Sequence, residues 1–209
     1  GEAVAADKAV NETLTLDTYG ITSLDAKTGA GSLKIIGVEG IDKITVDAEI
    51  HTNEGIDYTF SLEKNGNEAQ LIAEHQTRNG MHWTIGHDLR IDLIVKVPPS
   101  LAIDVDDGSG EIDIAGLTSA LKLEDGSGSV YIDGGSSLII DDGSGEIDVK
   151  NISGDITVDD GSGSTVIKDT GGDIYIKDGS GGIKVFLIEP MKKTISSSNS
   201  AHVDRLHVP

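Results

Sequence analysis

The sequence contains no cysteine, which excludes disulfide bonds, thiol catalysis and thiolate-bound zinc. Positive charge is scarce, because 16 Lys and Arg residues stand against 36 Asp and Glu residues and the net charge is -20. Affinity for nucleic acid depends largely on neutralising phosphates with Lys and Arg, so nucleic acid is excluded as a partner. No stretch approaches the roughly 18 consecutive apolar residues of a membrane span, and no transmembrane segment is expected.

Glycine is abundant, at 27 residues, and much of it recurs in one tetrapeptide. Asp-Gly-Ser-Gly occurs five times, with starts at residues 107, 125, 142, 160 and 178. An apolar pair spaced two residues apart precedes each tetrapeptide, and a second pair follows it, with Thr165 as the one polar member. Spacing by two residues is the period of a β-strand, and paired glycines in every half-repeat argue against a helical repeat. The preceding pairs are Ile103/Val105, Leu121/Leu123, Leu138/Ile140, Ile156/Val158 and Ile174/Ile176, and the following pairs are Ile112/Ile114, Val130/Ile132, Ile147/Val149, Thr165/Ile167 and Ile183/Val185.

Each half-repeat of about nine residues holds one short strand and one turn, which fits ordinary strand lengths. The second glycine of the tetrapeptide supplies positive φ, and the Asp can accept a hydrogen bond from the turn backbone. Such short strands bury little surface alone, so each should pair in parallel with its counterpart one repeat later, about 4.8 Å away. The sequence therefore predicts an all-β, single-stranded parallel β-helix (β-solenoid) with about 18 residues per coil and two principal faces.

Residues 1–209 are predicted to form one continuous domain, because no flexible linker interrupts them. Residues 1–100 are irregular: 32–36 and 43–48 resemble degenerate coils, whereas longer strands at 58–62, 70–75, 81–85 and 90–97 indicate hairpins around residues 56–97. Turns are expected at Asn65-Gly66 and Asn79-Gly80. Residues 101–185 are the regular repeats. Residues 186–209 are expected to form a cap at Phe186, Leu187 and Ile188, followed by an edge strand or a mobile tail.

The Asp-Gly-Ser-Gly turns between short alternating strands, introduced by residues 90–98 (RIDLIVKVP), resemble the bacterial "putative adhesin" family of toast-rack and auto-transporter head-type domains. The resemblance covers most of the chain and is strongest over residues 58–185. It implies a right-handed parallel β-helix, export to the bacterial cell envelope, in the periplasm or at the surface, and no established enzyme activity. The right hand also agrees with the crossover rule for parallel strands. The opening residues lack the pattern of an intact signal peptide, so a mature chain without its signal peptide is expected.

Stacked coils would place nine carboxylates along one edge, in an inner and an outer column. Repulsion between adjacent members is somewhat under 1 kcal/mol at the dielectric constant of water. Two interpretations remain open: the inner members cap their own turns while the outer members stay hydrated, or the edge associates weakly with calcium. Calcium-binding β-rolls have an additional Asp that is absent here, and no other cofactor is expected. The inner column is Asp107, Asp125, Asp142, Asp160 and Asp178, and the outer column is Asp106, Glu124, Asp141 and Asp159, with Lys177 at its end.

A polysaccharide-active enzyme is a less favoured interpretation. Paired carboxylates occur at Glu111, Asp113, Glu146 and Asp148, but they are expected on a flat, wet sheet where acid-base catalysis is poorly supported. Arginines and aromatic platforms for sugars are scarce. No histidine spacing matches a metal or triad motif at residues 51, 75, 82, 87, 202 and 207. The sequence therefore predicts a non-enzymatic structural or adhesion-type module with a rigid acidic surface, which contacts an envelope protein or a glycan and is able to self-associate.

Overall fold

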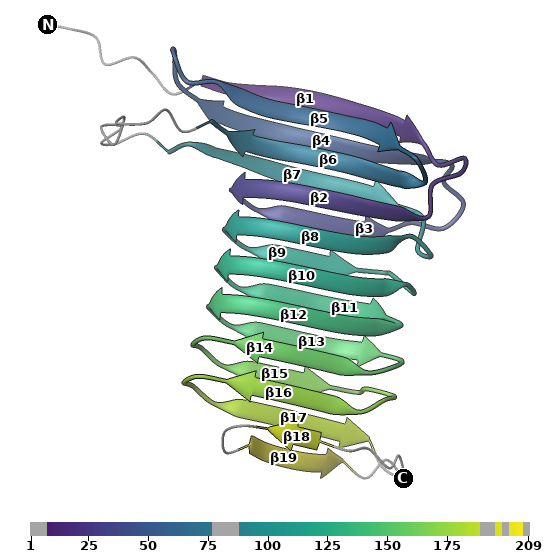
Figure 1. Cartoon of the computed structure of the whole chain (residues 1–209), viewed down its shortest axis with the longest axis vertical. Coiled ribbons are helices and arrows are strands. Elements are labelled where there is room, and N and C mark those ends of the chain that lie inside the picture. The colour runs from purple at the N-terminus through teal and green to yellow at the C-terminus, as the bar shows by residue number, and fades with distance from the viewer. Residues whose placement is uncertain (1–7, 77–87, 189–194, 198–200, 207–209) are drawn as a thin grey trace, which may run out of the picture.

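The computed structural model describes residues 8–76, 88–188, 195–197 and 201–206, and it is all-β with two mixed sheets (Figure 1). The described residues contain no helix, and therefore none that is long and apolar enough to cross a membrane. Sheet A has the strand order β1-β4-β7-β3-β9-β11-β13-β15-β17-β19, and sheet B has the order β18-β16-β14-β12-β10-β8-β2-β6-β5.

The Asp-Gly-Ser-Gly repeats form the regular half of this stack. Strands alternate between the two sheets, and each pairs in parallel with the strand two positions later in the chain. This confirms the predicted pairing of strands one repeat apart. The strands are β8 (Ala102–Ser109), β9 (Ile112–Ala115), β10 (Ala120–Ser127), β11 (Val130–Gly135), β12 (Ser137–Ser144), β13 (Ile147–Ile152), β14 (Ile156–Asp160), β15 (Thr165–Lys168), β16 (Ile174–Asp178) and β17 (Ile183–Ile188).

The core lies between the two sheets. Both members of every predicted apolar pair point inward and are at most 2% exposed, and Thr165 is also fully buried. Full burial of such an aliphatic side chain contributes about 1.5–3 kcal/mol, so every coil adds several kcal/mol of hydrophobic stabilisation. At the corner, the second glycine of each tetrapeptide has a positive φ between 109° and 122°, as predicted.

The N-terminal half is irregular, as predicted, and of its two predicted degenerate coils the one at residues 32–36 is found. Strands β2 (Ser23–Ala30) and β3 (Leu33–Gly37) lie directly against β8 and β9 and pair with them in parallel. The following strands, β4 (Lys43–Thr52), β5 (Tyr58–Asn65), β6 (Glu68–His75) and β7 (Arg90–Val97), are inserted between this coil and the repeats in sequence, yet they lie beyond it in space (Figure 1).

Residues 43–48 do not form a coil, in contrast to the prediction. They belong to β4, which pairs antiparallel with β1 (Lys8–Asp17) on one side and with β7 on the other. The predicted hairpin at Asn65-Gly66 is confirmed, because β5 and β6 pair antiparallel around a tight turn in which Gly66 has a φ of 64°. The expected strand 81–85 and the Asn79-Gly80 turn lie outside the described residues.

The C-terminal end differs from the prediction in its cap, whereas the expected edge strand after residue 190 is present. Phe186, Leu187 and Ile188 were expected to cap the core, but they continue β17 and pair in parallel with β19 (Ala201–Leu206). Strand β18 (Ile195–Ser197) pairs in the same way with β16, so β18 and β19 are the edge strands of the two sheets at this end.

Candidate functional site

The strand register aligns the predicted carboxylates in two columns. In sheet B, Asp107, Asp125, Asp142, Asp160 and Asp178 are successive register partners, and we call them the inner column. Asp106, Glu124, Asp141 and Asp159 are aligned in the same way and form the outer column. Lys27 precedes the outer column and Lys177 follows it, so a cation stands at each end.

The two columns lie on opposite faces of sheet B, although the sequence interpretation placed them along one edge. The outer column is exposed to solvent, whereas the members of the inner column are only 1–4% exposed. Adjacent residues of a strand point to opposite faces, and the tetrapeptide Asp continues the alternation of the core. Ile103, Val105 and Asp107 therefore share the inner face.

Few donors reach the inner column. Thr28, which is aligned with it from β2, donates its hydroxyl to Asp107 at 2.5 Å, and Thr165 donates to Asp160 at 3.4 Å. The backbone N–H of Ser180 donates to Asp178 at 3.1 Å, which is the turn capping expected from the sequence. By contrast, no hydrogen bond of ordinary geometry reaches the buried carboxyl oxygens of Asp125 and Asp142, although the backbone N–H groups of Ser127 and Ser144 are near enough to oppose the rise in their pKa.

Burial is the main cause of a raised pKa throughout the inner column. It raises the pKa of Asp107 and of Asp125 to about 7, with the Thr28 hydrogen bond opposing the shift at Asp107 and the charge of Asp107 adding to it at Asp125. Burial and the charges of Asp125 and Asp160 raise the pKa of Asp142 to about 8. The pKa of Asp160 is raised to about 6, and that of Asp178 is raised by burial.

The calcium interpretation of the nine carboxylates stays a prediction. Among the described residues, three ligand atoms of His, Asp or Glu come within 4.8 Å of one another at Glu49, His51 and Asp92, which lie on β4 and β7. Arg90 occupies this cluster: its Nε donates to Asp92 at 3.0 Å, and its Nη2 lies 3.3 Å from the Nε2 atom of His51. A guanidinium thus already supplies the positive charge that a metal ion would bring.

Two hollows lie next to each other on the outer face of sheet A. The larger, of about 600 Å³, crosses β1, β4, β7, β3 and β9, and its polar lining includes Lys34, Asp47, Glu111 and Asp113. The smaller, of about 390 Å³, is lined by Asp113, Tyr131, Asp148, Lys150 and Lys168. Because both include Asp113, they form one continuous recessed surface, which we call the sheet A face.

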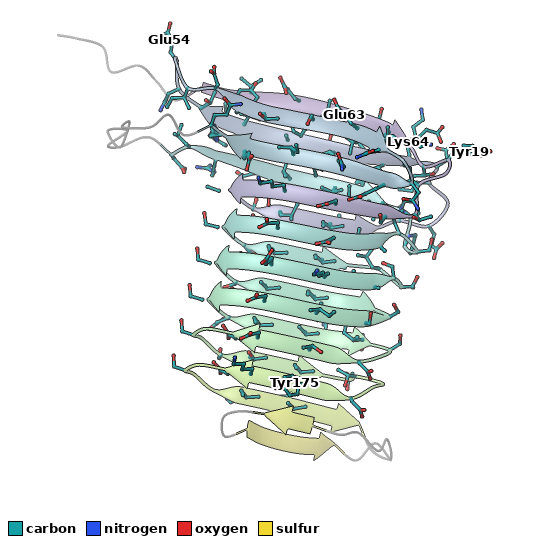
Figure 2. The ribbon with its side chains drawn as sticks, in the orientation of Figure 1. Tyr19, Glu54, Glu63, Lys64 and Tyr175 are labelled. Carbon is teal, nitrogen blue, oxygen red and sulfur yellow. The ribbon has the colours of Figure 1, made fainter. Side chains whose placement is uncertain are left out.

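Three of the predicted carboxylates, Glu111, Asp113 and Asp148, are thus brought to the same surface, but Asp113 and Asp148 are not adjacent. Tyr131 on β11 is the register partner of both, so its ring stands between their strands and is 37% exposed. On the opposite side of the molecule, the outer face of sheet B carries Tyr175, which is 54% exposed and is labelled in Figure 2. His82, His87 and His207 lie outside the described residues.

No protein-family model and no curated protein matches this chain. Similar solved structures include a "putative cell adhesion protein" from Clostridium sporogenes, with 12% identity, a TM-score of 0.45, and coverage of 96% of this chain and 98% of that chain. A "putative adhesin" from Bacteroides fragilis has 14% identity, a TM-score of 0.46, and coverage of 94% and 97%. A "putative lipid binding protein" from Parabacteroides distasonis has 13% identity, a TM-score of 0.33, and coverage of 94% and 96%.

Proposed function

We propose that this chain is a non-enzymatic, adhesion-type module of the bacterial cell envelope, built on a single-stranded, right-handed parallel β-helix. The parallel pairing of β8 to β17 with their counterparts one repeat away supports the β-helix. The right hand follows from the crossover rule, since strands joined across parallel pairs turn right-handed almost always. Such a stack is a stiff support that holds side chains at fixed spacing over a long surface.

The sheet A face is the observation on which the proposed binding function rests. It combines a half-exposed aromatic ring, Tyr131, with carboxylates and with Lys150 and Lys168. Aromatic rings stack on apolar faces of sugars, while carboxylates and ammonium groups bond the surrounding hydroxyls. We therefore propose a glycan as the partner.

Binding without turnover is the outcome that this surface favours. Acid-base catalysis needs one carboxyl group kept protonated by a secluded environment and a second group kept ionised. Asp113 and Asp148 instead line an open hollow on the surface of a sheet, with Tyr131 between them. The surface offers hydrogen bonds and stacking to a sugar, and its carboxyl groups lie in an open hollow.

A glycan panel with two tyrosine variants tests the proposal. Tyr131→Ala removes the ring of the sheet A face and should weaken binding at least about tenfold, the equivalent of about 1.4 kcal/mol. Tyr175→Ala removes a more exposed tyrosine from the opposite face, and it should leave the affinity unchanged. Equal effects of both variants, or no retained glycan at all, would refute the assigned surface, and release of reducing ends from a bound glycan would refute a non-enzymatic role.

Envelope display is tested separately. Fractionation of cells that produce the chain from its native gene should place it with the envelope, and protease treatment of intact cells separates a surface location from a periplasmic one. Recovery in the cytoplasmic fraction would contradict the proposed location without bearing on the glycan measurement.

A further inference from the structure

The inner column has no positively charged neighbour. The five carboxyl groups face the interior of the stack, and none of the described Lys, Arg or His side chains belongs to the buried set. Across the core, sheet A presents its inward aliphatic side chains and Thr165, which contacts Asp160. Through their own strands, the column members also meet the negative charges of Asp106, Asp141 and Asp159 on the outer face.

A fully ionised column would be strongly unfavourable. An ionised carboxylate only accepts hydrogen bonds, so two neighbouring carboxylates cannot bond each other. Successive members are register partners on parallel strands about 4.8 Å apart, close enough for strong repulsion away from water. The buried oxygens of Asp125 and Asp142 accept no hydrogen bond of ordinary geometry, and the turn amides of Ser127 and Ser144 offset the effect of burial on their pKa only in part. A buried acceptor without a well-placed donor is destabilising, and protons shared within the column would supply the donors that the turns do not.

We propose that the inner column binds protons in place of a cation, as a ladder of carboxyl groups that share protons with one another, so that the folded protein loses stability as the pH rises through neutrality. A proton on one member turns an acceptor into a donor towards the next member. Asp125 is placed to donate to Asp107 in this way, and the hydroxyl of Thr28 completes the ladder at its N-terminal end.

The sign of the effect is opposite to that of an ordinary ion-paired aspartate. An unfolded Asp has a pKa near 3.9, whereas the first four members have values of about 7, 7, 8 and 6 when folded. Near pH 6 the folded protein therefore holds about three more protons than the unfolded chain. The contribution of these four groups to the stability is fully present below about pH 4, and it is lost as the pH rises towards 8.

Proton linkage in the intact protein is the direct test. Urea unfolding at a series of pH values should show the unfolding equilibrium constant rising by about a thousandfold per pH unit near pH 6, equivalent to three protons released on unfolding. Calorimetric unfolding in buffers of different ionisation enthalpy counts the same protons without any variant. A stability that is flat or that rises between pH 5 and 7 would overturn the proposal.

A matched pair of substitutions at adjacent positions isolates the ladder. Asp142→Asn keeps the shape of the side chain and supplies a permanent hydrogen-bond donor. It should therefore remove at least one of the protons released on unfolding, so that the unfolding equilibrium constant rises about tenfold less per pH unit than in the wild type. Asp141→Asn removes a charge from the exposed outer column and should leave the dependence nearly unchanged. If the first variant does not fold, Asp125→Asn takes its place. Equal pH dependence in both variants would overturn the proposal, and so would suppression of the wild-type dependence by millimolar calcium, which would show a metal ion in the column.

Discussion

The glycine corners offer the most direct test of how closely the coils stack. Gly145 has a φ of 120°, and a Cβ added there would overlap the carbonyl oxygen of Gly128 in the preceding coil. Backbone conformation alone costs a non-glycine residue about 1–3 kcal/mol at such an angle. The overlap is with backbone, which cannot rotate away, and overpacking of this kind costs about 1–3 kcal/mol more. We therefore expect Gly145→Ala to lower the free energy of unfolding by at least about 3 kcal/mol.

Two other glycines provide graded controls in the same assay. Gly66 has a φ of 64° but open space around it, so Gly66→Ala carries only the conformational cost of about 1–2 kcal/mol. Gly182 has neither a positive φ nor a neighbour within 4 Å, and Gly182→Ala should stay within about 0.5 kcal/mol of wild type. The measurement is urea unfolding followed by circular dichroism with an unchanged m-value. If Gly145→Ala costs no more than Gly66→Ala, the close stacking of the corners is refuted.

Three further predictions follow from the packing and the charges. Ile140→Ala, at a fully buried position, should lower the free energy of unfolding by about 2–5 kcal/mol, whereas Ile139→Ala next to it, at a 50% exposed position, should change it little in the same urea titration. Thr28→Val removes the donor to Asp107 and should cost about 1–3 kcal/mol, and more at pH 8 than at pH 5, as measured by unfolding at both pH values. Arg90→Gln should cost about 1 kcal/mol at pH 7 and less at pH 3. Burial alone would raise the pKa of Asp92, but the Ser32 amide and Arg90 outweigh it and hold that pKa low, so this contribution is lost as the carboxylate is protonated.

The repeat was predictable because its physical requirements are local. Spacing by two residues identifies the inward side chains of each strand, and a glycine in every corner identifies where the chain reverses. The buried pairs such as Leu138/Ile140 and Ile147/Val149 follow directly, and so does the Asn65-Gly66 hairpin. Each of these features is decided within about ten residues of sequence.

The arrangement of the first hundred residues was not predictable in the same way. Alternation is the same in a parallel strand and in an antiparallel one, so Ile44, Val46 and Ala48 could not reveal that β4 runs antiparallel to β1 and β7. Nor does any local signal show that β2 and β3 lie against β8 and β9. That contact joins Leu24 to Ile103 across an insertion of four strands, and it depends on the whole stack.

The inner column could have been located from the sequence, but the turn motif concealed it. Asp107 follows Ile103 and Val105 at the same spacing of two, which places it on the buried face. Interpreting Asp-Gly-Ser-Gly as a turn placed its Asp residues along the same edge as the outer column, as caps of their own turns, instead of on the buried face. When the two-residue alternation of a strand continues into a turn motif, it therefore predicts which residues of the motif are buried, even where those residues are polar.

The two ends of the stack differ in the direction of their edge strands. At the N-terminal end the last strands, β1 and β5, pair antiparallel with their neighbours, and Leu16, Tyr58, Phe60 and Leu62 pack against the core from above. An antiparallel strand cannot be followed by another coil of the same kind in register, so this end closes the repeat. At the other end β18 and β19 keep the parallel direction of the coils, and the hydrogen-bonding pattern of the repeats continues to the last described strand. Self-association through strand edges stays a prediction, and β18 and β19 are the described edge strands whose direction matches that of a further coil.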